Sequence, residues 1–232
     1  MIQHPPDQKW LELGGGENPN VHPQCMGGPD VNVDIRICHN AQGQRTVDCL
    51  IDLNQFPWFL ESNEFDGLVS IFCLEHVSWR NTRKYISEMI RVLKPGGKII
   101  IGLPNTEKQL LKIQEDTDGW DGKDFFDSAS CILFGDGNYS ANFHSSFWSP
   151  SIAARLFSDA GFENVIIQPF SLIPNADLSR STDMMVTATK PLENNEEKAI
   201  DVVSKEEIKK EGASFTELAK KHIEEAVLKE IK

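Results

Sequence analysis

Short apolar runs alternate along the chain with polar or irregular segments. Trp10–Leu13, Val31–Ile35 and Val47–Leu53 are rich in apolar and β-branched residues, and Phe65–Leu74 is apolar almost throughout. A continuous run of this kind is typical of a strand that is buried on both faces of a sheet. Lys98–Leu103 has the same character. The pattern predicts parallel strands joined by crossover connections, which is an α/β architecture.

Helical periodicity and breaker residues mark the connections and the end of this domain. Asn81–Leu93 carries an apolar stripe, and Lys94–Gly97 supplies a cation, a proline and two glycines that end a helix. Ser149–Ala160 has a proline near its start and a glycine directly after it, so a second helix is expected there. Val165–Phe170 and Met184–Thr189 are strand-like runs joined by a polar loop, and they predict a reversed terminal pair.

Two segments depart from this pattern. Residues 105–149 contain aromatics, glycines and acids without clean periodicity, and such a long irregular segment in a compact domain is usually functional. We expect it to be an insert that covers the substrate. The predicted organisation is a domain over residues 1–190, followed by a charged linker and an amphipathic helical tail over residues 191–232. That tail helix either docks on its own domain or contacts a partner or a second copy.

Composition and charge narrow the class of protein. Apolar residues make up 40% of the 232 residues and charged residues 25%, as in an ordinary globular chain. Against 23 Lys and Arg stand 35 Asp and Glu, and most of this excess lies in residues 1–189. Such a surface repels a phosphate backbone, so a nucleic-acid substrate is not expected. The apolar runs are far too short to span a membrane, and the N-terminus has no signal-peptide pattern.

The cysteines indicate a reducing compartment rather than a metal site. There are five of them, an odd number without a CxxC pair, so we expect a cytoplasmic protein. A zinc site could be sought among His22, Cys25, Cys38 and His39. However, adjacent Cys38 and His39 give poor chelate spacing, and no second paired motif accompanies them. The sequence therefore predicts no metal site.

A glycine cluster at the end of the first predicted strand points to a ligand. Gly14–Gly16 follow Glu12 closely, and glycines permit positive φ and a close approach of a ligand to the backbone. The cluster is not the dinucleotide fingerprint GxGxxG, because Pro19 stands where that pattern needs glycine. In an open parallel sheet, ligands bind at the carboxyl ends of the strands, near the switch in strand order. A tight structural turn would look the same, so the cluster needs support from other residues.

That support comes from landmarks farther along the chain. Asp34 ends the second predicted strand, where a carboxylate can accept hydrogen bonds from both hydroxyls of a ribose, and Asp52 ends the third. Phe65–Val77 reads FDGLVSIFCLEHV, and Leu93–Asn105 reads LKPGGKIIIGLPN. In this order, the landmarks resemble the class I S-adenosylmethionine-dependent methyltransferases. The resemblance covers roughly residues 9–190.

The resemblance implies a fold, a cofactor and a set of cofactor contacts. The fold is a Rossmann-like, mostly parallel seven-stranded sheet with a reversed terminal hairpin and helices on both faces, and the cofactor is S-adenosylmethionine. The glycine turn would line the methionine end, Asp34 would hold the ribose hydroxyls, and Asp52 with Leu53 would meet the adenine. The end of the fourth strand would pass beside the sulfonium. The implied cofactor-binding residues are Glu12, Gly14, Gly15, Gly16, Asp34, Asp52, Leu53, Cys73, Leu74, Glu75 and His76.

Two histidines are candidates for a general base, from which a hydroxyl acceptor would benefit. His76 directly follows the fourth strand, and His144 lies in the insert among aromatic residues. Either histidine could instead be structural.

The segment between Gly16 and Val31 has no helical stripe, so the usual first helix is expected to be short or absent. The insert's aromatics form either a lid with an acceptor platform or a small core of their own; they are Trp120, Phe125, Phe126, Phe134, Tyr139, Phe143, Phe147 and Trp148.

The sequence favours methyl transfer from S-adenosylmethionine to an oxygen or nitrogen of a small molecule or glycan intermediate. The main alternative is a catalytically silent methyltransferase-like subunit that binds or scaffolds through its tail. The intact glycine turn and Asp34 argue against that alternative, because a silent copy has no physical need for an open ligand turn. An aminopropyl transferase is a further rival, but the acidic pair that would grip a polyamine is not evident in the fourth strand.

Overall fold

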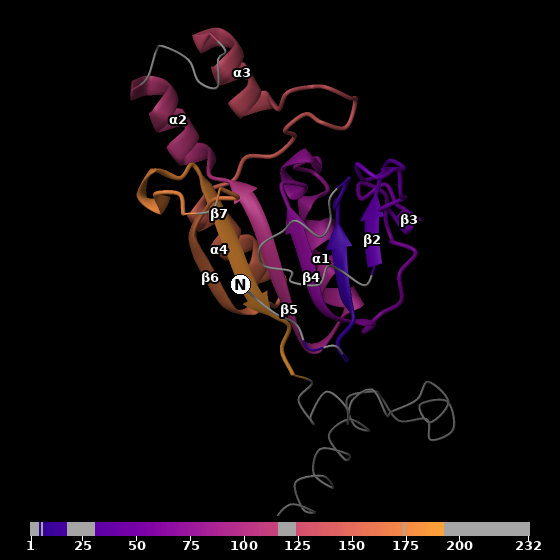
Figure 1. Cartoon of the computed structure of the whole chain (residues 1–232). Helices are drawn as coiled ribbons and strands as arrows, with labels where there is room; N and C mark the ends of the chain where they lie inside the picture. Colours follow the sequence, from indigo (N-terminus) through magenta and orange to yellow (C-terminus); the bar gives the residue numbers. More distant parts are fainter. Residues whose placement is uncertain (1–4, 6, 18–30, 116–123, 174, 193–232) are drawn as a thin grey trace, which may run out of the picture. The chain divides into compact units, whose positions relative to one another are not determined.

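The computed structural model describes residues 5, 7–17, 31–115, 124–173 and 175–192. The strands are β1 (Trp10–Leu13), β2 (Val31–Asp34), β3 (Cys49–Leu50), β4 (Phe65–Ile71), β5 (Leu93–Pro104), β6 (Glu163–Phe170) and β7 (Asp183–Thr189). They form one seven-stranded sheet in the order β3-β2-β1-β4-β5-β7-β6 (Figure 1). The first five strands are parallel, and β7 runs antiparallel between β5 and β6. The predicted Rossmann-like sheet with a reversed terminal hairpin is confirmed.

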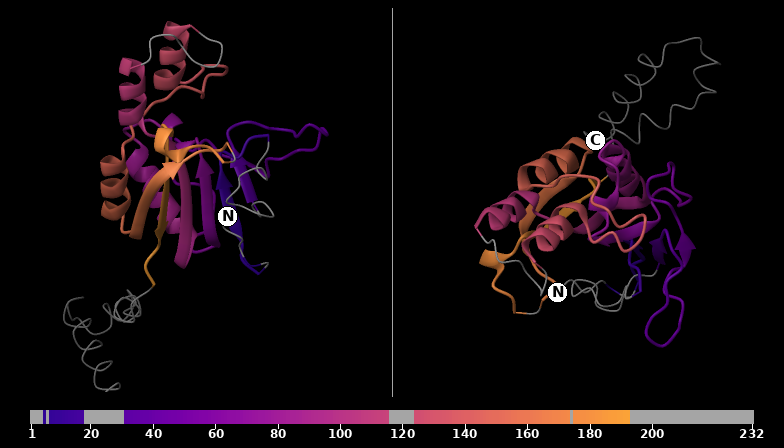
Figure 2. Two further views of the ribbon diagram at one scale, coloured as in Figure 1. Left: turned by 60° about the vertical axis from the view of Figure 1, so that its left-hand side comes forward. Right: turned by 90° about the horizontal axis from the view of Figure 1, so that it is seen from above.

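Two helices, α1 (Thr82–Val92) and α4 (Pro150–Asp159), pack against one face of this sheet (Figure 2). Both lie where the sequence predicts them. The strand period of two divides the buried residues between the faces. In β5, Ile99 and Ile101 join the large core beneath the helices, whereas Ile100 belongs to the smaller cluster on the opposite face. Apolar packing on both faces of the sheet therefore fixes the strands whose carboxyl ends form one edge of the sheet.

Two predicted strands are shorter than expected. β3 contains only Cys49 and Leu50, because the backbone N–H of Asn54 donates to the Asp52 carboxylate at 2.9 Å and turns the chain. β4 ends at Ile71, because Phe72 adopts a positive φ of 52° that a strand cannot continue. A single 3-10 turn, Leu74–His76, follows. Asp52 and the predicted sulfonium segment therefore lie in turns beyond the strands.

The predicted turn at Lys94–Gly97 lies instead within β5, which begins directly after α1. Leu93 pairs with Phe65 of β4, so the first residue after the helix is already in the sheet. On the other side, the Gly96 N–H donates to the Lys190 carbonyl at 3.0 Å, and the Lys190 N–H donates to the Gly97 carbonyl at 2.8 Å. Lys94–Gly97 do follow the end of the helix. However, hydrogen bonds to β4 and to Lys190, directly after β7, keep this segment extended as part of the sheet.

The prediction that the insert is irregular is wrong for two of its segments, which are helical. It contains helices α2 (Thr106–Glu115) and α3 (Phe125–Phe134), which contact each other and project beyond the carboxyl ends of the parallel strands (Figure 1). The Asp124 side chain caps α3 by accepting the Asp127 backbone N–H at 2.9 Å. Each helix has too few buried residues to give a clean apolar stripe, so hydrophobic periodicity did not predict either helix. The N-cap residue Asp124 was the sequence signal that could have indicated the start of α3.

Two predictions fall outside the described residues. The short or absent first helix concerns mainly residues 18–30, and the amphipathic tail helix concerns residues 193–232. The division of the chain near residue 190 also stays a prediction. Within the part of the chain that the structure describes, no helix is long and apolar enough to cross a bilayer.

An ion pair within the last turn of α1 connects this helix to the loop before β4 through hydrogen bonds to the loop backbone. Arg91 Nη2 donates to Glu88 Oε2 at 2.7 Å, and the same guanidinium donates to the carbonyls of Leu60 and Trp58. Glu88 Oε2 also accepts the Trp58 backbone N–H at 2.7 Å. The hydrogen bond from Arg91 is the main reason why the pKa of Glu88 lies below its ordinary value. The pair therefore stabilises the folded state through an ionised carboxylate.

Replacing Glu88 by glutamine is expected to lower the free energy of unfolding at pH 7 by about 2–3 kcal/mol, because bonds to a charged group are lost. Since the folded-state pKa of Glu88 is lowered, its contribution is present above the unfolded pKa and is lost as the pH falls through the folded pKa. Urea unfolding from pH 7 to below pH 4 should therefore show the two proteins converging in acid. Exposed Glu163→Gln is the control and should change neither stability nor its pH dependence. Equal stability of Glu88→Gln and wild type at pH 7 would contradict the role of the pair.

Candidate cofactor and active site

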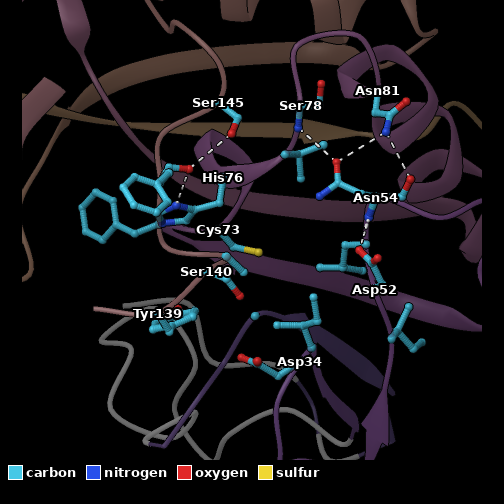
Figure 3. A pocket seen from close by; sticks show the side chains of 18 residues that line it. Asp34, Asp52, Asn54, Cys73, His76, Ser78, Asn81, Tyr139, Ser140 and Ser145 are labelled. Carbon is cyan, nitrogen blue, oxygen red and sulfur yellow. Dashed lines mark hydrogen bonds between the residues drawn. The ribbon is translucent and has the colours of Figure 1, made fainter. Parts of the chain in front are cut away.

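A cavity of about 580 Å³ opens at the carboxyl ends of the parallel strands (Figure 3). It lies at the ends of β1, β2 and β4, where the strand order switches from β2-β1 to β4-β5. This is the place at which open α/β sheets bind ligands. The volume is within the range of small-molecule and cofactor sites. We call it the first cavity.

The glycine turn is shaped by close contacts on both sides. Gly14 has a φ of +74°, and a Cβ there would lie 2.5 Å from Cys73 Sγ. Gly15 donates its N–H to Asn32 Oδ1 at 3.1 Å, and a Cβ there would lie 2.9 Å from Asn32 Cγ. Gly16 has a φ of +58°. Gly14 and Gly15 therefore leave no room for a Cβ, the positive φ favours glycine at Gly16, and of the three glycines Gly14 reaches the first cavity.

Two carboxylates from the neighbouring strands face the same cavity. Asp34 is 8% exposed, and its Oδ1 accepts the Arg36 backbone N–H at 2.9 Å. Asp52 accepts from the backbone of Asn54 through one oxygen and from the side chain of Gln55 through the other. These local bonds fix the position of each carboxylate. Figure 3 shows Asp34 and Asp52 pointing into one hollow, beside Cys73.

About half of the predicted cofactor residues line the first cavity. Gly14, Asp34, Asp52, Leu53, Cys73 and His76 do so. The other five do not line it: Glu12, Leu74 and Glu75 are buried, and Gly15 and Gly16 belong to the glycine turn. Whether each contacts the cofactor stays a prediction.

Several lining residues were missed because they reach the first cavity from loops. Asn54 and Asn81 are one example: Asn81 Nδ2 donates to the Asn54 carbonyl at 3.1 Å, and the Ser78 N–H donates to Asn54 Oδ1 at 3.0 Å. Only their nearness to Asp52 and His76 in the sequence could have suggested them. The residues of this kind are Ile35, Ile51, Asn54, Phe72, Val77, Ser78, Asn81, Ser140, Ala141 and Ser145.

The segment after α3 forms the outer wall of the first cavity. The Tyr139 ring lies 3.7 Å from the Arg36 guanidinium, so it is held against the loop after β2 by a cation–π contact. The Ser145 and Ser146 N–H groups donate to the Glu75 carbonyl at 2.7 and 3.2 Å. These contacts bind the insert to the turn after β4. Of the insert's aromatics, Tyr139 lines the first cavity, whereas Trp148 is buried in the domain core and not in a small core of the insert's own.

A second cavity of about 420 Å³ lies beside the first, and its lining is largely apolar. Its wall comes from α2, the end of α3 and the segment 144–147, and it includes His144. Ser145 lines both cavities. The His76 ring, in the first cavity, is 5.2 Å from the His144 ring between centroids. The two predicted bases therefore lie together at the junction of the cavities, one in each.

Burial sets the protonation states at this junction. It lowers the pKa of His76 and of His144, so both imidazoles are neutral near pH 7 and carry a lone pair. Burial raises the pKa of Glu75 to about 8 and that of Asp183 to about 6. It also raises the pKa of Cys73 to about 12, so this thiol stays protonated and is no nucleophile.

Comparison with known proteins agrees with this geometry. Residues 31–101 match a family model described as a methyltransferase domain. No curated protein sequence matches the chain. A methyltransferase from Archaeoglobus fulgidus, described as dependent on S-adenosylmethionine, is 14% identical with a TM-score of 0.52, over 79% of this chain and 86% of that one. One from Mesorhizobium loti is 13% identical with a TM-score of 0.50, over 79% and 91%. These two likenesses show the fold.

The strand order, the reversed β7 and the cavity at the switch point define a class I methyltransferase fold. Together with the match of residues 31–101 to a methyltransferase domain, they support an S-adenosylmethionine-dependent methyltransferase. The first cavity fits that cofactor, since it joins a turn with no room for a Cβ at Gly14 to the Asp34 carboxylate.

Proposed function

We propose that the protein transfers a methyl group from S-adenosylmethionine to an oxygen or nitrogen of a small molecule or glycan intermediate that binds in the second cavity. The observation that carries this proposal is the junction of the two cavities at His76, His144 and Ser145. An acceptor atom at that junction would be within reach of a methyl group held in the first cavity. The apolar wall of the second cavity favours an acceptor that has a ring or another apolar part.

The chain's own residues would orient the cofactor. We propose that Asp34 accepts hydrogen bonds from the ribose hydroxyls, that Asp52 and Leu53 meet the adenine, and that Gly14 leaves room for the methionine end. When bound, the cofactor supplies a strongly electrophilic methyl group. The protein then has to align the acceptor with that group and exclude water.

We assign the acceptor's proton to the histidine pair. His144 lies in the second cavity with its pKa lowered, so its neutral imidazole can accept a proton from a hydroxyl or ammonium group. His76 lies 5.2 Å farther on, between ring centroids, toward the first cavity. A half-buried imidazole in each cavity supports general-base catalysis better than a purely structural role for both.

Location and the tail are also part of the proposal. Cys38, Cys49 and Cys73 are free thiols, which supports the cytoplasm as the compartment. Residues 191–232 are proposed to form a linker and an amphipathic helix. That helix would contact a second copy of the chain or another partner, or dock on its own domain.

The test is formation of S-adenosylhomocysteine by the full chain with labelled S-adenosylmethionine and a panel of phenols, sugars and amines. Product formation with a ring-bearing hydroxyl or amine acceptor supports the proposal. Cofactor binding without product from any acceptor class would instead favour the catalytically silent binding subunit.

The acceptor cavity predicts a difference between two neighbouring residues of α2. Both side chains are exposed, but Leu110 lines the second cavity and Leu111 does not. Leu110→Arg should raise the KM for the acceptor by roughly tenfold or more, because the long side chain fills an apolar pocket. Its Kd for S-adenosylmethionine should be unchanged, and Leu111→Arg should leave both constants unchanged. Equal effects of the two substitutions would place the acceptor elsewhere.

A further inference from the structure

Three titratable side chains gather where the two cavities meet. Glu75 and His76 belong to the 3-10 turn after β4, and His144 comes from the segment after α3. One carboxylate oxygen and one nitrogen of each ring lie within 4.8 Å of one another. Glu75 Oε1 is 4.0 Å from His76 Nε2. Two imidazoles and a carboxylate are a donor set that divalent transition metals prefer.

The Glu75 carboxylate is not satisfied by the protein around it. Glu75 is 2% exposed, and its Oε2 has no hydrogen-bond partner among the described residues. A buried carboxylate oxygen without a partner is costly unless a cation compensates it. A divalent ion at this position would supply that compensation.

Both imidazoles are arranged as metal ligands usually are. His76 Nδ1 lies 3.1 Å from the Phe143 carbonyl, so an N–H at Nδ1 donates there and leaves Nε2 with a lone pair toward Glu75. His144 forms backbone hydrogen bonds with Leu133 and Ile132. Histidines that bind metals usually donate their other ring N–H to such groups, which fixes the tautomer and the ring.

We propose that Glu75, His76 and His144 bind a divalent transition metal ion, with Zn²⁺ as the first choice. Ligand atoms of tetrahedral zinc lie about 3.4 Å apart, so these side chains would close by roughly 1 Å around the ion. The sequence predicts no metal site, because the three ligands come together only in the fold.

Three protein ligands leave one position open for an exchangeable group. The role of the ion, unlike its binding, rests on the proposed function: it would hold the acceptor's oxygen or nitrogen and lower its pKa. His76 and His144 would then act as ligands, and the proton would leave to water rather than to an imidazole.

The test is metal binding by the full chain after treatment with a chelator. Calorimetric titration with Zn²⁺, absorption spectra with Co²⁺ and the melting temperature with and without Zn²⁺ should show one site per chain. Glu75→Gln and His144→Ala should each weaken Zn²⁺ binding by at least about 100-fold and abolish the rise in melting temperature. Glu75→Gln has the same shape without the buried charge, so it should fold even if His144→Ala does not. The matched controls His39→Ala and Cys49→Ser alter exposed groups outside the cluster and should bind like wild type.

Each outcome separates this proposal from the methyltransfer proposal. Absence of Zn²⁺ and Co²⁺ binding, or binding that survives in Glu75→Gln and His144→Ala, would overturn the metal site. Methyl transfer by such metal-free protein would leave the proposed function intact, with the histidines as proton acceptors. One bound ion that depends on Glu75 and His144, in a protein that transfers no methyl group, would support the site and overturn the proposed function.

Discussion

Replacing Asp34 by alanine is expected to raise the Kd for S-adenosylmethionine by roughly 10²–10⁴-fold, while the protein stays folded. In our proposal, the two oxygens of this carboxylate accept hydrogen bonds from the two ribose hydroxyls. Each bond to a charged group contributes about 1.5–3 kcal/mol, and every 1.4 kcal/mol is about tenfold in Kd. Asp34 is nearly buried at the end of β2, so water can replace the lost bonds only poorly.

Calorimetric titration of wild type and variants measures this effect directly. Asp34→Asn keeps the shape and one acceptor oxygen, so its Kd should lie between those of the wild type and the alanine variant. Asp159→Ala removes a carboxylate from the end of α4 and should leave binding unchanged. S-adenosylhomocysteine should show the same order, because it has the same ribose. A Kd for Asp34→Ala within about threefold of wild type, less than one hydrogen bond is worth, would remove Asp34 from the cofactor site.

Replacing Gly67 by alanine is expected to destabilise the fold by about 3 kcal/mol, or to prevent folding, because the core has no room for one more methyl group. Gly67 pairs with Trp10 across β4 and β1. A Cβ at Gly67 would lie 2.5 Å from Trp10 Cε3 and closer still to two other indole atoms. Trp10 is 2% exposed and packs against the sheet, so the ring cannot move aside without opening the core.

Urea unfolding monitored by circular dichroism gives the loss of stability. Gly102→Ala in β5 is the matched control, since its Cβ would lie 3.1 Å or more from flexible side-chain atoms of Ile71 and Phe170. Its cost should be clearly smaller. The double variant Trp10→Leu with Gly67→Ala should be more stable than the sum of the two single changes predicts, because the smaller side chain relieves the overlap. Additive losses would show that the overlap is not the cause.

Local patterns in the sequence were sufficient for the sheet and for six of the eighteen residues that line the first cavity. Strands that are buried on both faces need continuous apolar runs, and a ligand turn needs glycines, so Phe65–Ile71 and Gly14–Gly16 could be read directly. Asp34 could be placed because the carboxyl ends of parallel strands meet at one edge of the sheet. These features depend on neighbours within a few residues.

The tertiary structure alone decided the junction of the cavities. His144 lies far along the chain from Glu75 and His76, and hydrogen bonds from Ser145 and Ser146 to the Glu75 carbonyl bring the insert to that turn. Packing between α2 and α3, rather than an apolar stripe, makes the insert helical. Sequence by itself therefore predicted the strands and the glycine turn from local conformational needs, and the class of protein and the cofactor from the family resemblance that these landmarks carry. The acceptor cavity and the Glu75, His76 and His144 cluster depend on contacts between distant segments, which no local pattern encodes.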